Sequence, residues 1–194
     1  MKHLAALLAV LLLAGCATTP VPRSSESAAG LSAWQLNGRV SLTRGEEGWH
    51  ASLHWKQQAE RFFLKISGPL GQGGFQLSGD SRGVVLVDAD GQTYVARDAD
   101  ALLQQATGWQ LPVTGLRYWI RGLPAPLAGA AQTDQDAAGR LSQLVQSGWT
   151  VKYDRYQIVN NISLPDKLNL MRDDISVRII VDKWELDAVS VDLP

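Results

Sequence analysis

Short runs that alternate apolar and polar residues constrain the fold of this chain more than any other feature. Large apolar residues fall on even positions from Trp34 to Leu42 and on odd positions from Trp49 to Trp55. Alternation with a period of two is typical of strands that bury one face. The turn residues 44–48 lie between the two runs, so this part of the chain is predicted to form an antiparallel hairpin.

The same alternation recurs along the chain, in residues 62–66, 75–77, 84–87, 94–95, 149–153, 168–170 and 175–181. Residues 88–91 end in Asp-Gly, a strong hairpin signal between two of these runs. The pattern predicts roughly ten or eleven short strands. Consecutive strands joined by tight turns favour an antiparallel sheet, either rolled into a barrel or half-barrel or folded as a sandwich.

The middle of the chain departs from the strand pattern. Asp98 is a good N-cap for a helix over 99–108, with Leu102 and Ala106 one turn apart, and Gly108 would end it. A second helix is predicted over 113–121, with Leu116 and Ile120 on one face. The small and polar segment 125–139 is expected to be a mobile loop.

The amino terminus has the features of a secretory signal. Lys2 precedes a short apolar run, and the stretch 13–16 reads Leu-Ala-Gly-Cys. The run is shorter than the ~20 residues that a membrane span needs. The stretch 13–16 resembles the lipobox of bacterial lipoproteins. This resemblance implies a signal peptide over 1–15 and a lipid anchor on Cys16. The alternative is an ordinary signal peptide with a free cysteine. The resemblance, with Ala17 in place of aspartate, implies the periplasmic face of the outer membrane.

Two segments follow the anchor. Residues 16–30 are rich in Pro, Ser, Thr and Ala and predict a flexible tether. Residues 31–194 are long enough for a single domain with one core. The formal net charge of −1 shows no excess of either sign, and without a basic run we expect no nucleic-acid partner.

Signals for catalysis are weak, so we expect no enzyme activity, no metal and no cofactor. His50 and His54 lie on the polar side of one predicted strand, and no third metal ligand converges on them. The acidic pairs in 88–90 and 98–100 are explained by a hairpin turn and a helix cap. The sequence also contains no Gly-x-Ser-x-Gly motif of the usual lipases.

Several motifs together carry a family resemblance. Residues 116–124 read Leu-Arg-Tyr-Trp-Ile-Arg-Gly-Leu-Pro, and residues 67–71 read Ser-Gly-Pro-Leu-Gly. These segments are similar to the Leu-Arg-x-Trp-Ile-x-Gly-Leu-Pro signature and the Pro-Leu-Gly turn of the LolB family of outer-membrane lipoprotein receptors. Further matches lie at 55–58, 87–94, 147–149 and 182–184, in the order that the family has them.

The resemblance implies a mainly β fold with two or three short helices. The sheet would be an open, strongly curved antiparallel sheet, or unclosed β-barrel, with a helical lid over an apolar cavity. A monomer would accept the acyl chains of lipoproteins from a LolA-like periplasmic carrier and insert them into the outer membrane. Family position implies that Trp55, Trp119 and Trp149 line the cavity; the alternative is that they are ordinary core packing.

The turn Pro69-Leu70-Gly71 is the expected membrane-insertion loop. A leucine between proline and glycine in a strand connection is expected at the surface, although a small contact beneath the loop is the alternative. The resemblance implies that Leu70 protrudes and delivers lipoprotein into the membrane. Two other functions stay open: a structural envelope lipoprotein, and a lipocalin-like carrier of a small apolar ligand.

Overall fold

The computed structural model describes residues 27–69 and 73–186 of the chain. The expected signal peptide, Cys16, Leu70 and Gly71 lie outside the described residues. Within the described part, no helix is both long and apolar enough to cross a membrane.

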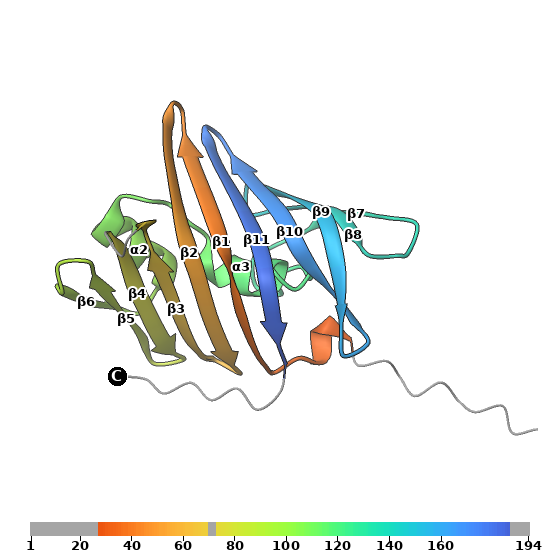
Figure 1. The fold of residues 1–194 in the computed structure, drawn as a ribbon, viewed down its shortest axis with the longest axis horizontal. Helices are drawn as coiled ribbons and strands as arrows, with labels where there is room; N and C mark the ends of the chain where they lie inside the picture. The colour runs from red at the N-terminus through yellow and green to blue at the C-terminus, as the bar shows by residue number, and fades with distance from the viewer. Residues whose placement is uncertain (1–26, 70–72, 187–194) are drawn as a thin grey trace, which may run out of the picture.

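One antiparallel sheet of eleven strands forms the body of the described structure, in the order β6-β5-β4-β3-β2-β1-β11-β10-β9-β8-β7 (Figure 1). The strands are β1 (Ala33–Arg44), β2 (Glu47–Gln58), β3 (Arg61–Ser67), β4 (Gly74–Asp80), β5 (Gly83–Asp88), β6 (Thr93–Ala96), β7 (Gln132–Gln135), β8 (Leu141–Gln146), β9 (Trp149–Val159), β10 (Ile162–Arg172) and β11 (Ile175–Glu185). The first and last strands pair at the centre of the sheet, and β6 and β7 form its two edges. The predicted open, unclosed antiparallel sheet is confirmed.

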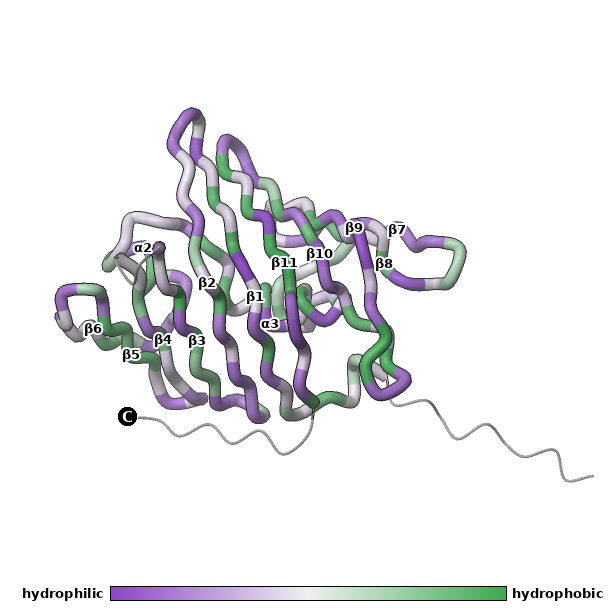
Figure 2. The backbone as a smooth tube through the Cα atoms, in the orientation of Figure 1, coloured by the Kyte–Doolittle hydropathy of each residue, from purple (hydrophilic) through white to green (hydrophobic). Residues whose placement is uncertain are grey.

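Alternation sets the register of the central strands. Leu36 pairs with Trp55 and Leu42 with Trp49, so the apolar positions of β1 and β2 share one face. Figure 2 shows hydrophobic and hydrophilic residues alternating along these strands. A bulge interrupts the pairing of β1 with β11 beside Gly38, where a Cβ atom would collide with the carbonyl oxygen of Ile180. Only glycine fits this close approach of two backbones.

Two short helices lie in the connection from β6 to β7, which therefore runs from one edge of the sheet to the other. Helix α2 (Ala99–Thr107) begins at Asp98, whose carboxylate accepts a hydrogen bond from the Ala101 backbone amide at 2.7 Å. It ends at Gly108, which has a left-handed conformation (φ 75°). Both ends are as predicted. Helix α3 (Val113–Trp119) is two residues shorter than predicted, and turns continue through Gly122.

The prediction of a mobile loop over 125–139 is wrong. Residues 132–135 form strand β7 and pair with β8. The turn before it is fixed by buried Gln146, which accepts a hydrogen bond from the Ala125 amide (2.9 Å) and donates to the carbonyls of Ala125 (2.8 Å) and Gly129 (3.0 Å). The polar composition reflects an exposed edge strand, because every residue of β7 is exposed.

Order also begins before the expected domain boundary at residue 31. The short 3-10 helix η2 (Ala28–Gly30) falls within the expected tether. Arg121, in the turn after α3, donates hydrogen bonds from Nη1 to the carbonyls of Ala28 and Leu31, each at 3.0 Å. Ala28 and Leu31 pack against the core. The last part of the expected tether is therefore attached to the folded domain.

Candidate functional site: an apolar space under a helical lid

A narrow space of about 50 Å³ lies between the buried face of the sheet and the two helices. Every side chain that lines it is apolar, and the lining comes from β1, β2, β3, β4, β10, β11 and the lid. Representative members are Leu42, Leu53, Trp55, Phe75, Val113 and Val177. Apolar spaces of this kind stay dry because they offer water no hydrogen-bond partner.

The lid is α2, α3 and their connection, residues 99–119. Leu103 of α2 and Leu116 of α3 face the space, together with Leu111 and Pro112 of the connection. Pro112 also borders two hollows on the other side of the lid. Pro112 therefore lies between the inner space and these two hollows.

Two arginines from the sheet hold the connection in place. Arg44, at the end of β1, lies over the Trp109 ring at 4.7 Å and donates a hydrogen bond to the Gly108 carbonyl at 3.4 Å. Arg172, at the end of β10, donates to Oε1 of Gln110 at 2.7 Å. Its guanidinium lies 4.8 Å from the centre of the Trp149 ring. Cation–π contacts contribute about 0.5–1 kcal/mol at exposed sites and about 2 kcal/mol when desolvated.

Asp100 ties the two lid helices together. Its Oδ1 accepts hydrogen bonds from the Thr114 amide at 2.9 Å and the Thr114 hydroxyl at 3.2 Å. Helix α3 has no side-chain cap of its own at Pro112, so this carboxylate satisfies one of its free amides. Burial raises the pKa of Asp100. The sequence interpretation assigned both Asp98 and Asp100 to a helix cap; only Asp98 caps α2.

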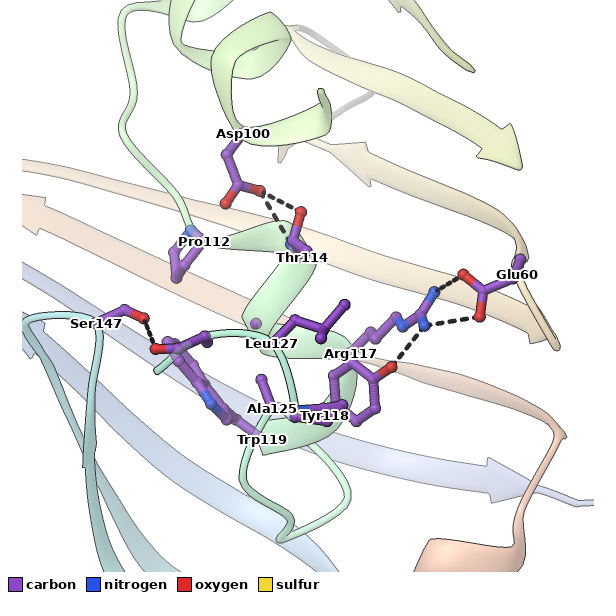
Figure 3. Close-up of a pocket in the computed structure, with 13 residues that line it drawn as sticks. Glu60, Asp100, Pro112, Thr114, Arg117, Tyr118, Trp119, Ala125, Leu127 and Ser147 are labelled. Carbon is purple, nitrogen blue, oxygen red and sulfur yellow. Dashed lines mark hydrogen bonds and ion pairs between the residues drawn. The ribbon is translucent and has the colours of Figure 1, made fainter. Parts of the chain in front are cut away.

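A second hollow, of about 320 Å³, lies on the outer side of α3 (Figure 3). Arg117 crosses one end and donates two hydrogen bonds to Glu60, at 2.9 and 3.0 Å. The turn fixed by Gln146 forms another wall and carries Leu127, which is 99% exposed. This hollow is open to solvent and mixes charged and apolar side chains.

The three tryptophans chosen by family position lie in different places. Trp55 lines the inner space and donates from Nε1 to Gln57 at 3.3 Å. Trp119 lines the outer hollow of Figure 3 and donates to Gln146 at 2.9 Å. Trp149 borders a third hollow, of about 350 Å³, beside Gln110 and Arg172. All three are nearly fully buried, and the structure does not place them on one wall.

The loop between β3 and β4 is described only at its two ends. Pro69 is exposed, and the Gly68 amide donates to the Gly73 carbonyl at 3.3 Å. The lid contacts of Arg44, Arg172 and Asp100 were not predicted from the sequence. No local signal marks them, because their partners lie in other elements, 64, 62 and 14 positions away.

A curved, unclosed antiparallel sheet with two helices over a wholly apolar space defines a class of open-barrel folds. Two solved structures share this fold with the chain. A LolA superfamily protein from Nitrosomonas europaea aligns with a TM-score of 0.52 over 84% of this chain and 88% of that chain, at 8% identity. A DUF1329 family protein from Desulfovibrio piger aligns with a TM-score of 0.51 over 82% and 88%, at 7% identity.

The chain belongs to the LolB family. The model of the family described as "Outer membrane lipoprotein LolB" matches residues 32–184. Proteins named outer-membrane lipoprotein LolB are similar over most of their length. That of Alkalilimnicola ehrlichii is 38% identical over 92% of this chain and 94% of its own length. That of Nitrosococcus oceani is 35% identical over 93% and 95%, and that of Pseudomonas putida is 38% identical over 82% and 78%.

Proposed function

We propose that this protein is an outer-membrane receptor that accepts the acyl chains of lipoproteins from a periplasmic carrier and passes them to the membrane. The observation that carries the proposal is the wholly apolar space between the sheet and the lid. Membership of the LolB family supports the same role. We propose no catalytic residue and no cofactor, because acyl chains can move between apolar sites without chemistry.

The energetics favour direct transfer between two apolar sites. Each exposed methylene costs about 0.8 kcal/mol in water, so a chain of many methylenes cannot cross the periplasm uncovered. A receiving site that binds tenfold more tightly than the carrier needs an advantage of only ~1.4 kcal/mol. The bilayer then offers a deeper apolar phase for release.

The size of the space requires the lid to move. A volume of about 50 Å³ is far below the ~300–1,000 Å³ of pockets that hold drug-sized ligands, and is too small for an acyl chain. The contacts that hold the connection are the hydrogen bonds of Arg44 to Gly108 and of Arg172 to Gln110, and the ring contact of Arg44 with Trp109. We propose that they break when cargo enters and that the connection around Leu111 and Pro112 moves outward.

Anchoring and delivery complete the proposal. Cys16 would carry the acyl chains that hold the protein at the periplasmic face of the outer membrane. Leu70, between Pro69 and Gly71, would enter the bilayer during delivery. Trp55 would contact the acyl chains directly, whereas Trp119 and Trp149 would support the two walls beside the lid.

A substitution that fills the space tests the proposal. Val177 lines it on β11, so Val177→Phe would place a ring where the acyl chain enters. Val151→Phe is a matched control, because Val151 is fully buried on β9 but does not line the space. Both changes overpack the core and cost about 1–3 kcal/mol. Transfer of a labelled lipoprotein from a loaded carrier is measured with each folded variant.

We expect Val177→Phe to lower uptake at least tenfold and Val151→Phe to leave it unchanged. Equal uptake by the two variants would contradict a binding role for the space. If the unmodified protein bound a fluorescent fatty acid but no lipoprotein, a lipocalin-like carrier would be supported. Uptake of neither ligand would support a structural envelope lipoprotein.

A further inference from the structure

The outer face of the central strands carries an excess of positive charge. Most apolar residues of β1, β2, β3 and β11 point inward, and the alternate residues, which include Phe63 and Ile180, point away from the lid. These outward positions hold two acidic residues, Asp182 and Glu185, and six basic ones, Arg39, Lys56, Arg61, Lys65, Arg178 and Lys183. The whole chain has a net charge of −1, so its charge is distributed unevenly between faces.

The two acidic residues are already neutralised. Asp182 pairs with Arg39 at 2.7 Å, and Glu185 pairs with Lys183 at 2.7 Å. The other four basic residues form no ion pair among the residues that the structure describes. The strand order β3-β2-β1-β11 places all of them on adjacent strands, in the middle of the sheet (Figure 1). This surface is called the basic face below.

A shallow groove of about 580 Å³ crosses the basic face. Cross-strand pairing arranges its polar side chains in two neighbouring rows. One row runs through Ser67, Ser52 and Arg39, and the next through His50, Ser41 and Arg178. Nδ1 of His50 lies 2.8 Å from the Ser41 hydroxyl oxygen, and the Arg178 guanidinium donates to Asn169 at 3.0 Å. The groove thus joins hydroxyl donors to guanidinium groups, a combination that binds phosphate oxygens well.

We propose that the basic face binds the anionic headgroups of phospholipids and that the groove accepts a lipid phosphate. Juxtamembrane basic residues gain about 1 kcal/mol each near an anionic membrane surface. Pro69 lines the groove, so the β3–β4 loop leaves the sheet on the basic face. The membrane would then lie against the convex side of the sheet, opposite the lid.

A protein partner fits this face less well. Protein interfaces depend on a few large apolar or aromatic side chains buried at their centre. The large hydrophobic residues that are exposed in the described structure are Val95, Leu127, Ile158 and Met171, and none lies on the four strands of the basic face. Attraction over such a surface is therefore mainly electrostatic, as expected for a lipid surface.

Vesicle flotation of the mature chain carrying Cys16→Ala, made with an ordinary cleavable signal in place of residues 1–15, tests the proposal without an acyl anchor, without the apolar signal and without cargo. We expect binding to vesicles of phosphatidylcholine mixed with phosphatidylglycerol, and much weaker binding to phosphatidylcholine alone or at high salt. Arg178→Ala and Lys65→Ala should each weaken binding about fivefold, the factor that corresponds to ~1 kcal/mol. Arg97→Ala is the matched control, since Arg97 is exposed outside the basic face.

Each alternative result would overturn the proposal. Unchanged binding by Arg178→Ala and Lys65→Ala would remove the basic face from membrane contact. An equal loss of vesicle binding with Arg97→Ala would show that binding depends on the total charge of the protein and not on the basic face. Loss of lipoprotein uptake with normal vesicle binding would identify the face as a docking site for an acidic protein. Lys65 makes no side-chain hydrogen bond to another described residue, so its replacement does not endanger folding. Because no cargo is present, failure of the receptor function would leave this measurement unaffected.

Discussion

Replacing Gln146 by methionine should strongly destabilise the protein, because this buried side chain joins the lid to the sheet. Gln146 is 2% exposed and forms four hydrogen bonds, two as acceptor and two as donor. Its Oε1 accepts from Nε1 of Trp119 and from the Ala125 amide, each at 2.9 Å. Methionine has a similar length but can replace none of these bonds.

The expected loss of folding free energy follows from the two buried donors that the substitution leaves without a partner. A buried unsatisfied group costs about 1–3 kcal/mol, so Trp119 Nε1 and the Ala125 amide together cost about 2–6 kcal/mol. A central value of ~4 kcal/mol corresponds to a fall of ~8–16 °C in Tm for a domain of this size. Equilibrium unfolding in urea gives the free energy directly, and the slope of the transition should not change.

A control and a second variant make the test specific. Gln143→Met changes the same side chain on the same strand, where the amide makes one exposed hydrogen bond to Asp134 at 3.3 Å, and should cost less than about 0.5 kcal/mol. Trp119→Phe removes the indole donor, so it should cost about 1–2 kcal/mol less in the Gln146→Met background than alone. Additive effects, or a cost below about 1 kcal/mol for Gln146→Met, would refute the reasoning.

Four further predictions concern the lid, the loop and the anchor. Burial raises the pKa of Asp100, so the folded state binds a proton more tightly than the unfolded state, and stability should fall as pH rises from the ordinary aspartate pKa through the raised one. Urea unfolding of Asp100→Asn should lack this decline; an identical pH profile would exclude Asp100 as its source. Arg172→Ala removes the bond to Gln110 and should speed the uptake of a fluorescent acyl ligand in stopped-flow mixing, whereas slower uptake would contradict a closing role. Leu70→Glu should retain cargo uptake but lose transfer to liposomes, because a charge costs about 2–4 kcal/mol deep in a bilayer and less near its surface; normal transfer would remove Leu70 from the mechanism. Cys16→Ala made with an ordinary cleavable signal should be soluble and folded and should still accept cargo from the carrier, and failure to do so would make the anchor part of the binding site.

Alternation predicted the strands that bury one face. The hairpin of β1 and β2, the Asp-Gly turn before β6 and the cap of α2 were all visible locally, because each depends on neighbouring residues. Strand β7 was not predicted, because an edge strand that is exposed on both faces has no alternation of apolar and polar residues. The first half of β10 was also missed: bulges beside Pro165 and Lys167 shift its register and break the alternation.

The candidate site was predictable in kind but not in geometry. Periodicity predicted two amphipathic helices over a sheet, and Trp119 is indeed fully buried. The rotation of α3 decides which hollow Trp119 borders, and no local pattern fixes that rotation. The lid contacts join residues 62 and 64 positions apart, as in Arg172 with Gln110 and Arg44 with Gly108. Such contacts depend on the path of the chain through the whole fold.

The lid segment is attached at one end to β6 and at the other to β7, the two opposite edges of the sheet. The segment between these two strands therefore spans the open side of the curved sheet. Flattening the sheet would move β6 and β7 apart and stretch this segment, whereas stronger curvature would relax it. The curvature of the sheet and the distance between the lid and the sheet are therefore coupled. A force that bends the sheet from its outer face would also change the volume of the apolar space beneath the lid.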